Sequence, residues 1–175
     1  MNEVFYNHED LAFVNNEWIA FLKRRAQQSP LRRSRLCLHR SHNDLVQQMI
    51  IVMCRDVLFR PHRHRVKTES FHMIEGSLDI ILFSDDGRPE RAVRMGPAAS
   101  GAIFCHRLSV SQFHAVLPRT DFVVMHEITT GPWVKEEAEF APWAPVASDA
   151  LRIFLENSAA QAVVSSQALI PEMLT

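Results

Sequence analysis

Two histidines and a glutamate lie close together in the sequence with the spacing of a metal site. His62 and His64 are two residues apart. Residues i and i+2 of a β-strand project to the same face, so both imidazoles would enter one cavity. Glu69 follows at the start of a second strand-like run, and a hairpin between the two strands would return its carboxylate to the imidazoles. The spacing therefore predicts a mixed nitrogen and oxygen ligand set.

His114 would complete this set from a separate strand, fifty residues after His64. Three imidazoles and one carboxylate suit one divalent transition metal ion, Fe(II), Mn(II), Ni(II), Zn(II) or Co(II), whereas Ca²⁺ and Mg²⁺ prefer oxygen. An octahedral ion would keep positions open for water or substrate, as catalytic sites do. A lone H-x-H also occurs by chance, so the prediction depends on the complete spacing.

Two further residues are candidates for catalysis. Arg60 shares the side of His62 by strand alternation, and its guanidinium could bind an anionic substrate or form a salt bridge at the rim. Glu127 lies near the end of a later strand and could act as a general base beside the metal, or belong to a structural polar pair. His72 is expected on the opposite face from Glu69, which argues against it as a ligand.

The elements that must position these residues are mostly strands. From residue 36 to about residue 127, short apolar runs alternate with turn residues, which is the pattern of an all-β sandwich or barrel. Asp86-Gly87 predicts a tight hairpin, with Val93 and Met95 in the return strand. The clearest predicted strands are Leu45–Cys54, Phe71–Ile74, Leu78–Phe83, Ala102–Phe104 and Phe122–Ile128.

Helices are predicted on either side of the β region. Asn16 can cap a helix over Glu17–Gln28, and Ser148 can cap a second from Asp149 to about Glu156. Residues 157–175 fit a packed arm, a segment exchanged with a partner or a frayed end. The expected organisation is a helical segment over residues 1–35 that packs on the barrel, a barrel over residues 36–146, and a helix with a tail over residues 147–175.

Composition and charge exclude several classes of protein. The 175 residues suit one globular domain, and 47% hydrophobic residues exclude extended disorder. A formal net charge of -1 gives no general attraction to nucleic acid or anionic lipid. The basic cluster Lys23, Arg24, Arg25, Arg32, Arg33 and Arg35 is interpreted as a solvated helix face and loop, with phosphate or acidic-sugar binding as the alternative.

The cysteines and the lengths of the apolar runs indicate the cellular compartment in which the protein is expected. Cys37, Cys54 and Cys105 lack C-x-x-C spacing and fit a reducing cytoplasm. Neither a signal peptide nor a membrane span is predicted. We therefore expect a cytoplasmic protein with no membrane partner.

The motif residues resemble a known family. Pro61-His62-Arg63-His64, Glu69 and Gly76 match the first cupin motif. Together with Gly131-Pro132-Trp133, Phe140-Ala141-Pro142-Trp143-Ala144-Pro145 and the upstream residues Arg33-Ser34-Arg35, His39, His42, Asp44 and Val46-Gln47, they resemble the WbuC family of cupin-fold metalloproteins. The resemblance covers about residues 32–145. It implies a double-stranded β-helix (the cupin jelly-roll barrel), a bound metal, a homodimer and an association with polysaccharide loci, without an established reaction.

Three positions depart from the cupin pattern. Asp56 stands where the first motif usually begins with Gly, Ser109-Val110-Ser111 replaces a Pro-x-Gly turn, and Pro118 replaces a final Asn. Turn residues can be exchanged without the loss of a ligand. The departures affect how His114 aligns with the histidine of the second cupin motif. His106 is therefore the alternative fourth ligand.

Three functions are compatible with these residues. The first is a metal-dependent enzyme that acts on a small oxygen-rich, saccharide-like molecule in polysaccharide metabolism, as an isomerase, epimerase or Fe(II) oxygenase. The second is a non-catalytic module that binds or senses a metal or small ligand. The third is a barrel retained only for assembly. The expected partners are a small-molecule ligand such as a sugar and a second copy of the chain, but no nucleic acid.

Overall fold

Two six-stranded sheets face each other in the computed structural model, which describes residues 3–134 and 138–164. The first sheet has, in order, β1 (Val4–Tyr6), β2 (Arg33–Cys37), β3 (Val46–Cys54), β10 (Phe122–Thr130), β5 (Glu69–Glu75) and β8 (Cys105–Leu108). The second has β11 (Ala138–Phe140), β4 (His62–His64), β9 (Phe113–Pro118), β6 (Leu78–Phe83), β7 (Pro89–Met95) and β12 (Val163–Val164). All neighbouring strands pair antiparallel, apart from the parallel pairs of β1 with β2 and of β12 with β7.

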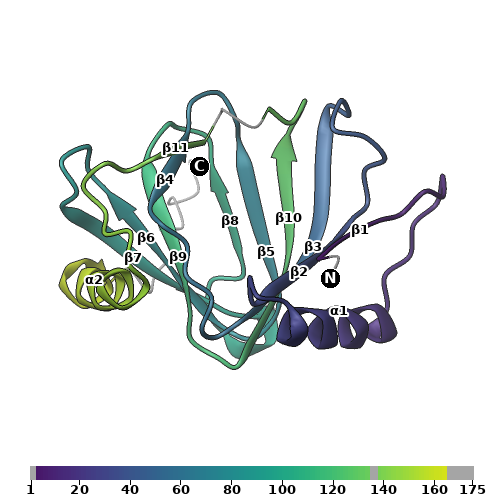
Figure 1. Ribbon diagram of the computed structural model, residues 1–175, viewed down its shortest axis with the longest axis horizontal. Coiled ribbons are helices and arrows are strands. Elements are labelled where there is room, and N and C mark those ends of the chain that lie inside the picture. Colours follow the sequence, from purple (N-terminus) through teal and green to yellow (C-terminus); the bar gives the residue numbers. More distant parts are fainter. Residues whose placement is uncertain (1–2, 135–137, 165–175) are drawn as a thin grey trace, which may run out of the picture.

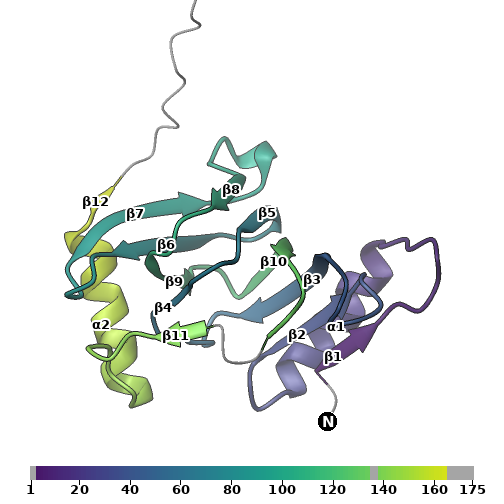
Figure 2. The same cartoon turned by 90° about the horizontal axis from the view of Figure 1, so that it is seen from above.

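The helices cover the outside of this barrel. In Figures 1 and 2, α1 (Asn16–Gln28) lies along the first sheet and α2 (Ser148–Gln161) lies beside the second. A short 3₁₀ helix, η1 (Ala98–Ser100), follows β7. The fold is therefore all-β, a double-stranded β-helix of the cupin type, as the sequence predicts. Within the described residues, no helix is long and apolar enough to cross a membrane.

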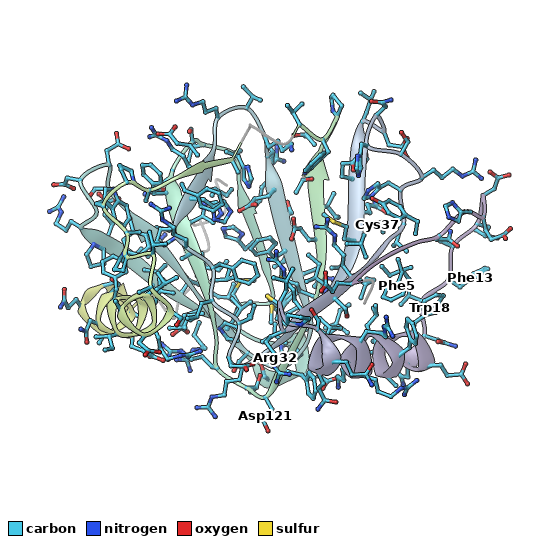
Figure 3. All side chains as sticks on the ribbon, viewed as in Figure 1. Phe5, Phe13, Trp18, Arg32, Cys37 and Asp121 are labelled. Carbon is cyan, nitrogen blue, oxygen red and sulfur yellow. The ribbon has the colours of Figure 1, made fainter. Side chains whose placement is uncertain are left out.

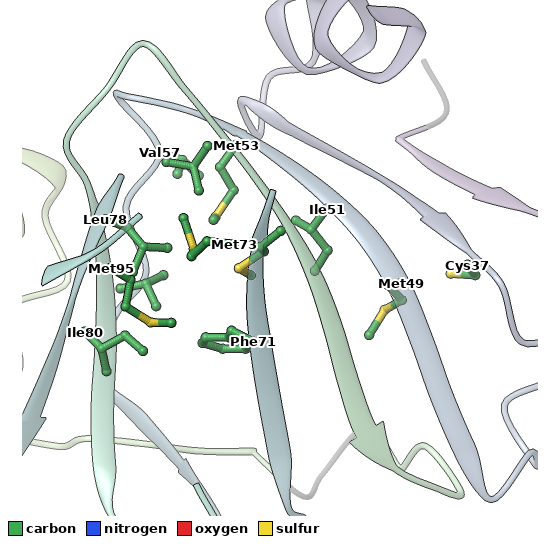
Figure 4. Packing of buried hydrophobic residues seen from close by; sticks show 13 residues of the cluster. Cys37, Met49, Ile51, Met53, Val57, Phe71, Met73, Leu78, Ile80 and Met95 are labelled. Carbon is green, nitrogen blue, oxygen red and sulfur yellow. The ribbon is translucent and has the colours of Figure 1, made fainter. Parts of the chain in front are cut away.

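The interior between the sheets is filled by alternate residues of the strands. Met49, Ile51 and Met53 of β3 point inward and pack with Phe71 and Met73 of β5 (Figure 4). The intervening residues of β3 face outward, where they pack against Leu22 and Ala26 of α1. Because both faces of β3 are covered, the strand reads as an almost continuous apolar run rather than an alternating one.

A second apolar cluster holds α2 against the second sheet. Leu151, Leu155 and Ala159 of α2 are buried in a cluster with Phe83 and Phe113. Trp143 packs on this cluster, and its indole Nε1 donates a hydrogen bond to the carbonyl oxygen of Asp85 at 2.9 Å. These contacts fix the segment after β11 and explain the proline- and aromatic-rich sequence there.

Two glycines make turns that a side chain would prevent. Gly87 closes the predicted hairpin between β6 and β7 with φ of 89°, and an added Cβ would lie 2.7 Å from the ring of Trp143. Gly76, which ends the first cupin motif, has φ of 76°, and an added Cβ would lie 2.0 Å from the carbonyl oxygen of Phe122. Both positions require glycine for conformation and for space.

Several element bounds differ from the sequence prediction. Asn15, not Asn16, caps α1, because its Oδ1 accepts hydrogen bonds from the backbone N–H groups of Glu17 and Trp18, both at 3.1 Å. Ala102–Phe104 is not a strand; Ile103 makes an isolated bridge, and the ladder with β5 begins at Cys105. Trp18, labelled in Figure 3, lies at the first turn of α1, and its ring centroid is 5.9 Å from that of Phe21.

The C-terminal helix is longer than predicted. It continues to Gln161 rather than ending near Glu156, and Ser148 provides no side-chain cap. Burial of Leu155, Ser158 and Ala159 explains the extension, because packing stabilises the later turns. The remainder of the predicted tail, residues 165–175, lies outside the described residues, and the division of the chain at residues 35 and 146 stays a prediction.

Candidate metal centre

His62 and His64 enter the barrel from β4, in the second sheet. Strand alternation turns both imidazoles to the inner face, with ring centroids 5.2 Å apart. Arg63 points outward, where its guanidinium pairs with Glu139 at 3.0 Å and with Asp85 at 2.9 Å. These ion pairs favour the strand orientation that directs both imidazoles inward.

His114 approaches from β9, the neighbouring strand of the same sheet. It stands directly opposite His62 in the pairing of β4 with β9, and the two ring centroids are 4.6 Å apart. The ligand nitrogens of His62, His64 and His114 all lie within 4.8 Å of one another. Metal–nitrogen bonds of about 2.0–2.1 Å place the ligand atoms around one ion about 3 to 4 Å apart. Small shifts of these side chains would therefore reach coordination distance.

Glu69 reaches the histidines from the opposite sheet. It begins β5, which pairs with β10 and β8, whereas β4 pairs with β9 and β11. The predicted hairpin between the strands of His64 and Glu69 is therefore wrong, because the residues between them carry the chain from one sheet to the other. The carboxylate still meets the imidazoles, with Oε1 2.9 Å from Nε2 of His114 and Oε2 3.6 Å from Nε2 of His64.

Backbone carbonyls orient two of the imidazoles. Nδ1 of His62 lies 3.1 Å from the carbonyl oxygen of Arg60, and Nδ1 of His114 lies 3.0 Å from that of Gln112. A carbonyl oxygen can only accept a hydrogen bond, so each Nδ1 carries a proton and Nε2 is the nitrogen left to bind at the cluster. Metal-binding histidines usually make such an outer hydrogen bond, so this donor set fits a divalent transition metal.

The environment shifts the pKa values of these groups in different directions. Burial, followed by the charge of His114, lowers the pKa of His62 to about 4, so its imidazole is neutral near pH 7. Burial acts to raise the pKa of Glu69, but the hydrogen bond and charge of His114 outweigh it and lower this pKa. For His114, burial acts to lower the pKa, and Glu69 raises it. A metal bound at Nε2 of His114 would take the place of the contact that this nitrogen makes with Glu69 Oε1 at 2.9 Å.

Glu127 faces the same interior from β10, opposite Phe71 of β5. Burial and then the charge of Glu69 raise the pKa of Glu127 to about 7, while cationic groups, first among them Arg35, act against the rise. A carboxyl group that titrates near neutrality can take up and release a proton under the same conditions. Glu127 is therefore suited to proton transfer.

Arg60 precedes β4 rather than lying in it, so strand alternation does not determine its direction. Its Nη2 donates a hydrogen bond to the carbonyl oxygen of Ala141 at 2.7 Å, and its guanidinium carbon lies 5.8 Å from the ring centroid of Phe140. The side chain thus lies beside the histidines and joins β4 to the segment around β11.

A cavity of about 670 Å³ lies between the two sheets. Its volume is within the range of pockets that hold small molecules. The predicted metal ligands His62, His64, Glu69 and His114 and the predicted catalytic residues Arg60 and Glu127 all contribute to its wall. Most other lining residues are apolar, including Ile51, Met53, Phe59, Phe71, Val116, Met125 and Phe140.

The remaining candidate histidines lie apart from this group. His106, the alternative fourth ligand, faces the interior next to Phe71, with ring centroids 5.5 Å apart, but within the described residues the histidine group does not include it. His72 is exposed on the other face of β5, as predicted. Nε2 of His42 lies 2.9 Å from the hydroxyl oxygen of Tyr6, and its ring is tilted against that of Trp133, with ring centroids 4.8 Å apart.

Sequence reasoning named Arg33 and Arg35 as members of a basic cluster but did not place them in the cavity wall. The interpretation of their basic cluster as a solvated helix face and loop is wrong for these two, because they lie in β2 and line the cavity. The signal that could have found them is the alternation of two arginines with Ser34 and Leu36, which is a strand pattern.

The fold and the converging side chains define a class, a cupin-type barrel with a histidine-rich candidate metal centre. Residues 14–95 of the chain match the model of a domain of unknown function, DUF6016. No curated protein matches the chain. The crystal structure of protein SO0799 from Shewanella oneidensis is similar, with a TM-score of 0.52, 14% sequence identity, and coverage of 73% of this chain and 82% of that chain. This likeness concerns the fold alone.

Two further solved structures are more distant. A cupin superfamily protein from Desulfitobacterium hafniense has a TM-score of 0.44 and 13% identity, with 56% of this chain and 76% of that chain covered. Oxalate decarboxylase from Bacillus subtilis, solved as its R92A mutant, has a TM-score of 0.45 and 13% identity, with 55% of this chain and 24% of that chain covered. The resemblance to the WbuC family stays a prediction.

Proposed function

We propose that this chain is a metal-dependent cupin in which His62, His64, Glu69 and His114 hold one divalent transition metal ion. One observation carries the proposal: three imidazoles from one sheet and a carboxylate from the other converge at the wall of a cavity. The backbone contacts of His62 and His114 support it, because they leave Nε2 of both rings to bind the ion. The ion is Fe(II), Mn(II), Ni(II), Zn(II) or Co(II), which all accept this ligand set.

The proposed reaction class is proton transfer at a small molecule, as in isomerisation or epimerisation. A bound ion would polarise a carbonyl or hydroxyl oxygen of the substrate. Glu127 takes a proton from the substrate and returns it, which its raised pKa favours. Arg60 orients an anionic or polar group through its guanidinium. The apolar lining around Phe71 and Met125 excludes water from the reacting atoms.

The proposed substrate is a small oxygen-rich, saccharide-like molecule of polysaccharide metabolism. The cavity volume of about 670 Å³ supports a ligand of this size. The resemblance to the WbuC family supports the link to polysaccharides and the homodimer. The spacing of the three cysteines supports the cytoplasmic location, and all three features belong to this proposal.

Metal analysis of variant proteins tests the proposal. We expect the wild-type protein, purified without chelator, to contain about one equivalent of a divalent transition metal. His62→Ala should lower this content at least tenfold, because loss of a ligand removes a bond to the ion. His72→Ala is the matched control, since His72 is exposed on the far face of β5 and should leave the content unchanged.

Two outcomes would contradict the metal site. The first is equal metal content in the wild type and His62→Ala. The second is an equal loss of metal from both histidine variants, which would point to adventitious surface binding.

A further inference from the structure

Arg33 and Arg35 project into the barrel from β2, near the edge of the first sheet. The residues that alternate with them face α1: the hydroxyl of Ser34 donates to the carbonyl oxygen of Leu22 at 2.7 Å, and Leu36 is buried against the helix. Strand alternation therefore directs both guanidinium groups to the opposite face, where both residues line the cavity.

These two arginines differ from several other arginines of the fold in lacking a carboxylate partner. Arg32, Arg63 and Arg94 each pair with an aspartate or glutamate. In the part of the chain that the structure describes, neither Arg33 nor Arg35 forms an ion pair within 4.0 Å. Arg33 lies over the ring of Phe59 at 4.9 Å, and the buried Nε of Arg35 has no hydrogen-bond partner. A shielded cation without a partner is costly, so an anion at this position would stabilise the pair.

With a divalent ion held by Glu69 and the histidines, the charges around the cavity would also favour an anion. Arg33, Arg35 and Arg60 line it, and the carboxylates outside the proposed ligand set are Glu3 and Glu127. Glu3 accepts a hydrogen bond from the hydroxyl of Ser29 at 2.9 Å. Burial and the charge of Arg35 lower the pKa of Arg33, which reflects two like charges held close together. A divalent ion at the candidate metal centre would make the lining more positive.

Glu127 lines the same cavity as the two arginines and the histidines. It faces the interior from β10, opposite Phe71 of β5. A ligand bound between Arg35 and His114 would thus pass beside the residue proposed to transfer the proton.

We propose that Arg33 and Arg35 form an anion subsite that holds a carboxylate or phosphate group of a small molecule whose other end lies at the histidine cluster. The guanidinium fork matches both groups with paired N–H donors. This inference deepens the proposed function and rests on it for the metal at the other end. It narrows the substrate from an oxygen-rich molecule to an acidic one, such as a uronic acid or a sugar phosphate.

Nuclear magnetic resonance of the arginine side chains tests the subsite in the wild-type protein. The probes are sodium acetate for a carboxylate and sodium phosphate for a phosphate, each titrated at constant ionic strength. We expect the Nε–Hε signal of Arg35 to shift and saturate, with half-saturation at about 1 to 10 mM for a small anion. The variants Arg33→Gln and Arg35→Gln assign the signals, and the probe that saturates at lower concentration identifies the group.

Arg32 provides an internal control, because its Nε already donates to Asp56 Oδ2 at 2.9 Å and its side chain does not line this cavity. The inference is overturned if the signals of Arg33 and Arg35 shift no more than that of Arg32 with either probe. Titration of both Zn(II)-loaded and metal-free protein separates the two proposals. A saturable Arg35 shift in protein that binds no zinc would retain the anion subsite and reject the metal centre.

Discussion

Each imidazole of the candidate metal centre has an outer nitrogen, Nδ1, and an inner nitrogen, Nε2. The hydrogen bond made by Nδ1 determines whether Nε2 is able to bind a metal. The carbonyl oxygens of Arg60 and Gln112 occupy Nδ1 of His62 and His114, so the rings cannot turn without losing a buried hydrogen bond. The inner nitrogens therefore remain directed into the histidine cluster. Orientation by the backbone makes the site insensitive to the identity of the residues that supply the carbonyls.

Glu127 should make stability depend on pH in a predictable direction. The pKa of Glu127 is about 7 in the folded protein, whereas its ordinary value, which applies to the unfolded chain, is 4.5. Between pH 4.5 and 7 the folded state therefore binds a proton that the unfolded state has lost. Stability from this group is complete below pH 4.5 and is lost as the pH rises to about 7. Glu127→Gln cannot ionise, so we expect the metal-free variant to exceed the wild type in free energy of unfolding by about 1 to 2 kcal/mol at pH 8 and by much less at pH 5.

Urea unfolding of metal-free protein at the two pH values measures this difference. Glu139→Gln is the control, because Glu139 is ion-paired with Arg63 and its pKa is lowered by the hydrogen bond from that arginine. It should lose stability at pH 8, opposite to Glu127→Gln. A pH-independent effect of Glu127→Gln would show that its carboxyl group titrates normally.

At the scale of single residues, the sequence predicts the convergence of the histidines with Glu69 well and the position of the β2 arginines poorly. H-x-H spacing and a later glutamate identify a local pattern, because alternation within one strand is visible in the sequence. The arginines of β2 have the same alternation, yet their role depends on which face of β2 meets the interior. That choice is made by α1, which covers Ser34 and Leu36, and no local pattern states where α1 packs.

At the scale of elements, the connection from β4 to β5 shows what local spacing in the sequence does not determine. Four residues separate His64 from Glu69, a length that suits a hairpin as well as a crossing between sheets. Local spacing cannot distinguish these arrangements, because the pairing partners, β9 and β10, come much later in the chain. The carboxylate reaches the imidazoles in either case, so the ligand prediction does not depend on the wrong hairpin.

The α2 helix should stabilise the second sheet through its buried face. Leu155 is fully buried in the cluster with Phe83 and Phe113, and truncation there leaves a cavity. We expect Leu155→Ala to lower the free energy of unfolding by about 2 to 4 kcal/mol. Ile153→Ala, on the same helix with a side chain 62% exposed, should change it by no more than about 0.5 kcal/mol.

Chemical denaturation of both variants checks the docking of α2. Metal content should remain that of the wild type in each, because α2 contributes no residue to the cavity wall. Equal losses of stability in the two variants would contradict the packing of α2 described above.

At the scale of the whole molecule, segments from both ends of the chain build the barrel. The first 35 residues include β1 and the start of β2, so this part of the chain contributes strands to the first sheet as well as α1. Val4 and Arg33 line the cavity. A β-barrel could be predicted from the turn-separated apolar runs, but the parallel pairing of β1 with β2 is a long-range contact that short-range periodicity does not encode.

A metal at the candidate centre would join the two sheets, because Glu69 belongs to one and the histidines to the other. Binding to the folded state alone contributes about 4 kcal/mol when the metal is present at about a thousand times its Kd. For a chain of this length, that corresponds to a rise in Tm of about 8 to 16 °C.

We expect chelation to reverse this rise in the wild type, and Glu69→Gln, which removes the carboxylate from the first sheet, to abolish most of it. Scanning calorimetry with and without chelator measures both effects. An unchanged Tm on chelation, or a full metal-dependent rise in Glu69→Gln, would mean that no ion links the sheets through this carboxylate.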